Sequence, residues 1–388
     1  MASDLVNSLS PSYFSSMMNK TIETGDKPLL NLAVGIPDGK TPKVITDRVK
    51  SAIDQEENQK YGPFRGKTEL KDSIKRFYKR TYGVDLQEEN VAILFGTKNG
   101  LVNFPLAHYN PGVGIMLPNP GYADYITAVE LVKGKAIDMP LLKENNYLPD
   151  FDALTEELKE TDLIYLNYPS NPLGAVANKT FFDDTIERFK DSHIKILHDF
   201  AYAAFGFNED HPSILASDPD FKTAIEIYSL SKGFNMSGYR IGFAVGNADM
   251  IESINRFQDH TNAGVFGVTQ EAAIAALDHA DELIPKQNEI FKRRKEYINE
   301  ALINLGIPIQ PIEGGIFGWI KVPDTFNGES FVDYLLKEQS ILTTPGIPFG
   351  DRGENYIRFS LAVDEEILST FVERMKEIKN LWENSASL

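Results

Sequence analysis

Residues 228–243 read YSLSKGFNMSGYRIGF and directly follow an apolar run that is typical of a buried strand. The strand ends in Ser229, Ser231 and Lys232, and Arg240 follows eight residues after the lysine, between two glycines. A lysine amine can form an imine with an aldehyde cofactor, while hydroxyl groups and a guanidinium can hold the phosphate of such a cofactor. A lysine seen alone is more often a solvated surface residue. The interpretation as a cofactor site therefore depends on the rest of the chain.

Length, charge and composition exclude several classes of protein. A chain of 388 residues favours two domains over one core. The net charge of −17 argues against binding to nucleic acids or anionic membranes, because both need basic surfaces. The chain has no cysteine, and its six histidines lack the spacing of a zinc site, so we expect no metal ion. No apolar run is long enough to span a membrane and the N-terminus lacks a leader pattern, which predicts a cytoplasmic protein.

Short apolar segments alternate with helical stretches through the centre of the chain. This order is typical of an α/β fold in which a largely parallel sheet is covered by helices on both faces. The candidate site residues come just after these strands, at the edge where open α/β sheets bind ligands. The predicted central strands are 91–95, 114–117, 163–167, 194–198, 224–230 and 241–245. Around them we expect helices at 41–53, 67–82, 249–257, 271–280, 282–305 and 365–382, and strands at 29–38, 314–322, 341–344 and 356–361.

The stretch around Lys232 resembles the signature of class I and II aminotransferases, which are pyridoxal-phosphate enzymes of fold type I. The resemblance rests on the Ser-x-Ser-Lys motif with Asn235, Gly238, Arg240 and Gly242 at matching distances, and it spans nearly the whole chain. It implies a large domain with a mostly parallel seven-stranded sheet and a smaller α+β domain built from both chain ends. The limits we expect are 1–45 for an N-terminal arm and part of the small domain, 46–285 for the large cofactor-binding domain, and 286–388 for the small C-terminal domain.

A phosphate site is expected at residues 96–100, GTKNG, which open a helix whose free N–H groups can face an anion. In the resembled family this turn holds the cofactor phosphate, which implies that Thr97 and the backbone of Lys98 do so here. The lysine is a departure, because a small or acidic residue is more usual at its position. The resemblance adds Ser229, Ser231 and Arg240 to this phosphate site.

Tyr61 matches a family tyrosine that reaches across a dimer interface to the phosphate of the partner subunit. If this holds, the protein is a homodimer with shared active sites. The alternative for Tyr61 is a packed loop tyrosine with a solvated hydroxyl group.

The resemblance implies four residues around the pyridine ring of the cofactor. Tyr122, presented by a proline-rich turn, is expected to stack on the ring, with core packing as the alternative. Asn171, in the loop NYPSNPLGA, and Tyr202 are expected at the phenolic oxygen. Asp199 follows a buried strand, and its carboxylate is expected to pair with the ring nitrogen, although an aspartate at a strand end is usually a helix cap.

The substrate site is implied by residues far apart in the chain. Gly35 lies near the end of the apolar segment 29–38, and the resemblance implies that its backbone lies near the substrate carboxylate. Arg358 lies in YIRFSLA on a partly buried strand, and a buried guanidinium favours a bidentate acid. The resemblance assigns it, with Asn171, to the substrate; a surface arginine is the alternative.

Together these residues predict a transamination. Lys232, Asp199 and Tyr202 are the expected catalytic residues, and an L-amino acid and a 2-oxo acid are the expected substrates of a ping-pong reaction on pyridoxal 5'-phosphate. A pyridoxal-phosphate-dependent β-lyase (a C–S lyase) on the same fold is the alternative, because it would use the same residues. A regulator that binds an effector without catalysis is disfavoured, since the acidic chain has no basic DNA-binding segment. Side-chain specificity stays open.

Overall fold

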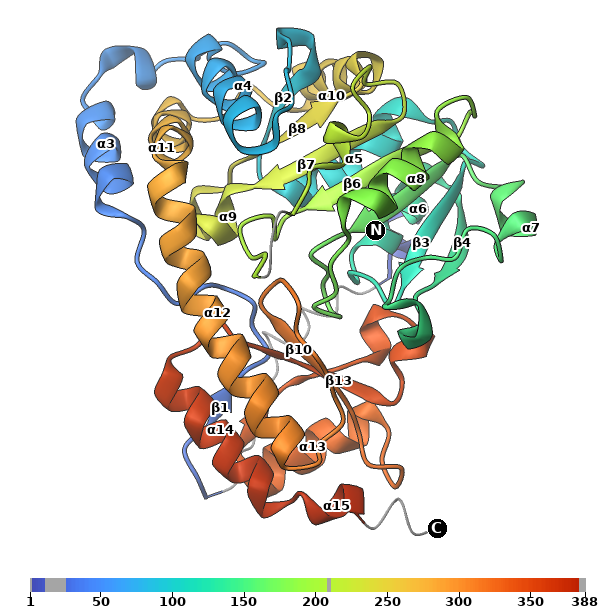
Figure 1. Ribbon diagram of the computed structural model, residues 1–388. Helices are drawn as coiled ribbons and strands as arrows, with labels where there is room; N and C mark the ends of the chain where they lie inside the picture. The colour runs from blue at the N-terminus through green and yellow to red at the C-terminus, as the bar shows by residue number, and fades with distance from the viewer. Residues whose placement is uncertain (1, 11–25, 208–210, 384–388) are drawn as a thin grey trace.

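The computed structural model describes residues 2–10, 26–207 and 211–383. Figure 1 shows a large domain above a smaller one, with the long helix α12 (Ala280–Asn304) running continuously from one to the other. The expected limit at 285/286 falls inside this helix. The domain limits therefore remain a prediction.

The large domain is organised around a seven-stranded sheet in the order β2-β8-β7-β6-β5-β3-β4. All strands run parallel except β8, which pairs antiparallel with β2 and β7. The predicted α/β fold with a mostly parallel sheet is thus confirmed. The strands are β2 (Val91–Leu94), β3 (Gly114–Asn119), β4 (Lys135–Pro140), β5 (Leu163–Asn167), β6 (Lys195–Phe200), β7 (Ala224–Ser229) and β8 (Gly242–Gly246).

Helices cover both faces of this sheet, which explains why most of its strands are continuous apolar runs. Successive side chains of a strand point to opposite faces, so Val91 and Ile93 of β2 enter one core while Ala92 and Leu94 enter the other. The first core packs against α4 (Thr68–Tyr82), α8 (Lys179–Phe189) and α11 (Gly267–Asp278), and the second against α5 (Thr97–His108), α6 (Tyr125–Val132) and α10 (Ala248–Thr261).

The small domain is built from both ends of the described chain. Its antiparallel sheet has the order β12-β13-β10-β9, and a short parallel pair joins β1 (Leu30–Asn31) to β11 (Ile341–Leu342). Leu30 and Leu32 enter the same core as residues of the C-terminal helices. The sheet strands are β9 (Ile309–Gln310), β10 (Phe317–Lys321), β12 (Thr344–Pro345) and β13 (Tyr356–Ser360). The remaining helices are α1 (Asp4–Ser8), α3 (Lys43–Ile53), α7 (Thr155–Leu158), α9 (Leu230–Gly233), α13 (Gly328–Gln339), α14 (Glu365–Glu377) and α15 (Asn380–Glu383).

Two of the differences from the expectation have a clear physical reason. The strand predicted over 29–38 is limited to Leu30–Asn31, because beyond it the carbonyl groups of Ala33 and Gly35 accept hydrogen bonds from side chains. The edge strand β4 was not predicted, since its exposed residues include Lys135 and Asp138 and interrupt the apolar pattern. Among the described residues, no helix combines the length and apolar character needed to cross a bilayer.

Candidate active site

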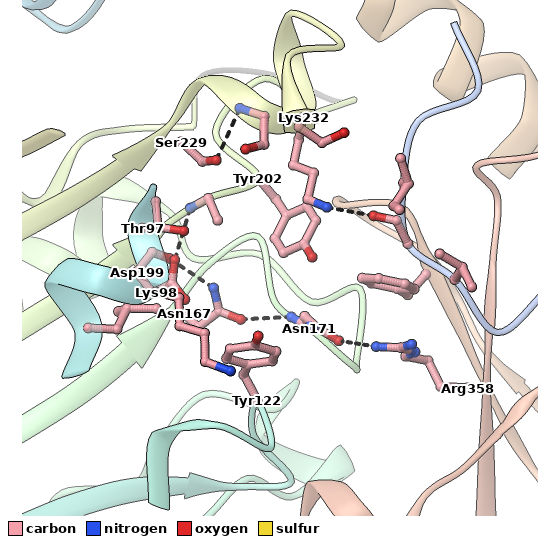
Figure 2. Close-up of a pocket in the computed structure, with 18 of the residues that line it drawn as sticks. Thr97, Lys98, Tyr122, Asn167, Asn171, Asp199, Tyr202, Ser229, Lys232 and Arg358 are labelled. Carbon is pink, nitrogen blue, oxygen red and sulfur yellow. Dashed lines mark hydrogen bonds between the residues drawn. The ribbon is translucent and has the colours of Figure 1, made fainter. Parts of the chain in front are cut away.

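A cavity of about 550 Å³ opens at the carboxyl ends of β5, β6 and β7, between the two domains. Figure 2 shows side chains from both domains converging on it. Twelve of the thirteen predicted site residues line the cavity: Gly35, Thr97, Lys98, Tyr122, Asn171, Asp199, Tyr202, Ser229, Ser231, Lys232, Arg240 and Arg358. The thirteenth, Tyr61, does not.

Lys232 lies in the single turn of α9, directly after the buried strand β7. Its Nζ donates a hydrogen bond of 2.6 Å to the carbonyl oxygen of Gly35. Burial, together with the positive charges of Arg358 and Arg240, lowers the pKa of this amine from 10.5 to about 8. A lysine with this pKa exchanges protons near neutral pH, as a nucleophile and general base must.

Asp199 is buried at the end of β6. Its Oδ2 accepts a hydrogen bond of 2.7 Å from the Tyr125 hydroxyl, and its Oδ1 accepts one of 3.1 Å from the backbone N–H of Ala201. Burial raises the pKa of the Asp199 carboxyl above its usual value, against these hydrogen bonds. Tyr125 was not predicted as a site residue, because its partner lies 74 residues away in the chain. Such a buried carboxylate favours a cationic partner in the cavity.

A chain of hydrogen bonds links Asp199 to Arg358 across the cavity wall (Figure 2). The Asn167 amide donates to the Asp199 carbonyl at 2.8 Å and accepts from the Asn171 N–H at 2.7 Å. Arg358 then donates to Asn171 Oδ1 at 2.9 Å. Asn167 was not predicted as a site residue, although its place between a buried strand and a pair of prolines could have indicated it.

Arg358 is almost fully buried, with 2% of its surface exposed. It also donates to the Ala33 carbonyl at 2.8 Å, and its guanidinium lies over the Phe317 ring at 4.0 Å from the ring centre and 4.8 Å from that of Phe349. These contacts fix the plane of the guanidinium, whose fork suits a carboxylate. The surface-arginine alternative is wrong.

A concentration of anion-binding groups lies where α5 begins. Thr97 is the first residue of α5, whose N-terminal N–H groups have no partner within the helix. Ser229, Ser231 and Arg240 line the same cavity. Gly96 has φ +83°, and a Cβ at this position would lie 2.5 Å from Arg240 Nη2. Glycine at 96 therefore lets the guanidinium approach the helix terminus closely.

Tyr122, Tyr202 and Lys98 also line the cavity. The Tyr122 hydroxyl donates to Asp124 Oδ2 at 2.6 Å, and Lys98 Nζ pairs with the same oxygen at 2.9 Å. Tyr202 is buried, which raises the pKa of its hydroxyl well above the usual value. Tyr61, in contrast, is 86% exposed. In the described part of the chain, no three His, Cys, Asp or Glu side chains gather as a metal ion would require.

Comparison with known proteins shows the family to which this chain belongs. A sequence model of aminotransferase class I and II matches residues 27–375. The chain belongs to the class I and II aminotransferase family. It is 41% identical over 382 residues to the L-glutamine--4-(methylsulfanyl)-2-oxobutanoate aminotransferase of Bacillus subtilis (strain 168), with 97% of this chain and 96% of the relative covered.

Other relatives agree. The LL-diaminopimelate aminotransferase of Aquifex aeolicus (strain VF5) is 36% identical, with 97% of this chain and 99% of that protein covered. A solved aminotransferase structure from Staphylococcus aureus has a TM-score of 0.94 and 46% identity, covering 98% of this chain and 100% of that chain. This aminotransferase accordingly depends on pyridoxal phosphate and transfers amino groups, as the sequence predicted.

The cavity fits pyridoxal phosphate. Lys232 supplies an amine for the aldehyde, and Asp199 supplies a buried carboxylate of raised pKa that a cationic ring nitrogen would pair with. The group around the start of α5 supplies hydroxyl groups and a guanidinium for the phosphate. The side chains that line the cavity thus offer a partner for each functional part of the cofactor.

Proposed function

We propose that this aminotransferase is a homodimer that moves the amino group of an L-amino acid to a 2-oxo acid in two half-reactions, with Lys232 as the proton carrier and Arg358 as the carboxylate anchor. The observation that carries the proposal is the convergence of Lys232, Asp199 and Arg358 on one cavity. Each comes from a different part of the chain, and each is of the type that the reaction needs.

Lys232 is proposed to move the proton of the substrate α-carbon. When bound, pyridoxal phosphate withdraws electrons from the α-carbon and thereby acidifies its hydrogen. The Lys232 amine has a pKa of about 8, so about a tenth of it is neutral and can accept a proton at pH 7. Its hydrogen bond to the Gly35 carbonyl holds Nζ on the cavity side of the chain. The amine can therefore take the proton and return it without leaving the site.

Arg358 is proposed to bind the α-carboxylate of both substrates. The guanidinium is held by Asn171 and by the Ala33 carbonyl, and the rings of Phe317 and Phe349 flank it. A fork fixed in this way loses little entropy when a carboxylate binds. It would hold the α-carbon within reach of Lys232, with Gly35 beside it.

The remaining polar residues are proposed to hold the cofactor. Asp199 would pair with the ring nitrogen, while Asn171 and Tyr202 would face the phenolic oxygen and Tyr122 the ring. Support comes from the burial of Asp199, Asn171 and Tyr202, and from the hydrogen bonds that fix Asp199 and Asn171 before any ligand binds. Thr97, the Lys98 backbone, Ser229, Ser231 and Arg240 would hold the phosphate.

The proposed homodimer rests on the surface around Tyr61. Tyr61 is 86% exposed, and Phe64 and Phe266 are each 52% exposed. The backbone of Pro63 and Phe64 approaches the segment before Phe266, since a Cβ at Gly264 would lie 3.2 Å from the Pro63 carbonyl oxygen and 3.4 Å from the Phe64 Cα. Exposed aromatic side chains gathered in this way favour a protein interface. Tyr61 would reach the phosphate of the partner subunit, which explains why it does not line its own cavity.

Hybrid dimers test this arrangement. Lys232→Ala and Tyr61→Ala subunits, mixed in equal amounts under conditions that exchange subunits, form hybrids in which one cavity has an intact lysine and an intact partner tyrosine. We expect activity to recover to about a quarter of the wild-type value, because half of the dimers are hybrids and each has one intact site. Activity no higher than the average of the two variants would show that Tyr61 acts within its own subunit or not at all. A monomer in sedimentation equilibrium would exclude the homodimer.

Amino transfer itself is tested with isotope-labelled substrates. The purified protein is incubated with one ¹⁵N-labelled L-amino acid and one unlabelled 2-oxo acid, and mass spectrometry locates the label. We expect the label in the amino acid derived from the oxo acid, and no transfer by Lys232→Ala. Label found in ammonia, with pyruvate formed from a sulfur amino acid and no second amino acid, would favour the C–S lyase. The cytoplasmic location stays a prediction, which cell fractionation would test.

A further inference from the structure

The distribution of charge in the cavity indicates which side chains the substrate can carry. Four cationic residues line the cavity within the described chain: Lys98, Lys232, Arg240 and Arg358. The proposed function uses Lys232 for proton transfer, Arg240 for the phosphate and Arg358 for the α-carboxylate. Lys98 is therefore the cation left for a second acidic group of a substrate, and its partners decide whether such a group is accepted.

Lys98 is already paired with a carboxylate. Its Nζ lies 2.9 Å from Asp124 Oδ2, and the same oxygen accepts the Tyr122 hydroxyl at 2.6 Å. Asp124 is 9% exposed as a residue, so its negative charge is fixed beside the cavity rather than dispersed in solvent. Lys98 and Tyr122 both line the cavity, where Figure 2 shows them next to each other. Within this pair the charge of Lys98 is balanced.

The other lining side chains near the substrate are mostly apolar. Val34 and Ile36 follow Ala33 on the N-terminal segment, Leu101 follows Lys98 on α5, and Phe317 lies under the Arg358 guanidinium. Asp199, the one acidic residue that lines the cavity in the described chain, is proposed to pair with the cofactor. A substrate carboxylate beyond the α-position would lose its hydration against this wall without meeting an unbalanced cation.

We infer that the cavity selects amino acids and 2-oxo acids with uncharged side chains, and that the Lys98–Asp124 pair enforces this choice by excluding dicarboxylic substrates. The inference rests on the proposed function and adds the substrate class to it. An acidic side chain would have to separate Lys98 from Asp124 or lie beside the Asp124 charge. An amide or thioether of the same length meets no such opposition.

Glutamine and glutamate form the test pair, because they have nearly the same shape and differ in charge. The purified enzyme loaded with pyridoxal phosphate is assayed with each as amino donor and one common 2-oxo acid as acceptor. We expect kcat/KM for glutamine to exceed that for glutamate by about tenfold or more, which corresponds to about 1.4 kcal/mol. A smaller preference for glutamine, or a preference for glutamate, would overturn the inference.

The Asp124→Asn variant tests the assigned cause. Asparagine keeps an oxygen for the Tyr122 hydroxyl but leaves the Lys98 charge unbalanced, so we expect the glutamate-to-glutamine ratio of kcat/KM to rise about tenfold or more. The double variant Lys98→Met/Asp124→Asn removes both charges, and the ratio is expected to return toward the wild-type value. An unchanged ratio in Asp124→Asn would overturn the role of the pair.

Ratios of two substrates on one protein cancel any loss of cofactor or folded protein. Asp85→Asn is the matched control, because Asp85 pairs with Lys79 at the same distance, 2.9 Å, outside the cavity. Its ratio should equal that of the wild type. Failure of the proposed function would look different: neither donor would pass its amino group to the acceptor in any variant. Transfer with glutamate as the favoured donor would overturn this inference alone.

Discussion

The buried amine of Lys232 lowers the free energy of unfolding, and this effect can be measured without any reaction. In the cofactor-free protein its pKa is about 8, against 10.5 for an ordinary lysine, so burial makes the charged amine unfavourable. Between these two values the unfolded chain binds more protons than the folded one, and stability from this group rises with pH. Below about pH 8 the full cost is present, and it disappears as the pH approaches 10.5.

Replacing Lys232 by methionine removes this cost while keeping a side chain of similar length. From the two pKa values the cost is about 3 kcal/mol at pH 7 and about 1 kcal/mol at pH 9.5. The hydrogen bond to Gly35 is lost at both pH values, so it affects the comparison little. We therefore expect the stability advantage of Lys232→Met over the wild type to fall by about 2 kcal/mol between pH 7 and pH 9.5.

Both proteins are unfolded with urea in the cofactor-free form at pH 7 and at pH 9.5. The measured quantity is the change, between the two pH values, in the gap between their free energies of unfolding. Other lysines and the tyrosines titrate equally in the two proteins and cancel. A gap in unfolding free energy that stays constant from pH 7 to pH 9.5 would refute the depressed pKa. The proposed role of the amine as a proton acceptor near neutral pH would lose its physical basis.

Three further changes test other parts of the structure. Gly96→Ala places a Cβ 2.5 Å from Arg240 Nη2, and we expect equilibrium dialysis to show cofactor binding weakened about tenfold or more. Tyr78→Phe removes the 2.7 Å hydrogen bond to the fully buried Glu226, which should cost about 1–3 kcal/mol in urea unfolding. Arg358→Lys cannot form the same fork, so we expect kcat/KM to fall about 100-fold or more with little change in cofactor affinity.

Each change has a matched control. Gly83→Ala introduces the same backbone strain at φ +71° with nothing within 4 Å, so it should leave cofactor binding unchanged. Tyr297→Phe alters a tyrosine that is 42% exposed and should cost little stability. Arg352→Lys alters an exposed arginine outside the cavity and should leave kcat/KM near the wild-type value. If a variant and its control show equal effects, the physical reason given for that variant is contradicted.

The sequence predicted residues that line the cavity where local order decides position. Lys232 and Asp199 follow buried strands, and the carboxyl ends of parallel strands meet at one edge of the sheet. Arg358 could be assigned only through the resemblance, since its burial between Phe317 and Phe349 depends on how the small domain folds. The motif therefore carried information that periodicity alone does not contain.

The missed features depend on contacts between distant residues. Tyr125 lies on helix α6 and Asp199 on strand β6, and a hydrogen bond joins their side chains. No spacing in the chain indicates this contact. The segment after Asn31 has the apolar pattern of a strand, yet the carbonyl groups of Ala33 and Gly35 accept hydrogen bonds from the side chains of Arg358 and Lys232. Edge strand β4 lacks the apolar run of the central strands because one of its sides faces solvent.

The N-terminal segment that contacts both Arg358 and Lys232 has a consequence for the order in which the protein is made. Arg358 lies 325 residues after Ala33 in the chain, so it leaves the ribosome well after Ala33, Gly35 and Lys232. All seven strands of the central sheet and Lys232 precede Arg358 in the chain, so they are synthesised before the carboxylate site is complete. The lysine proposed to hold the cofactor is therefore made before the arginine proposed to anchor the substrate, and cofactor uptake need not wait for the carboxylate site.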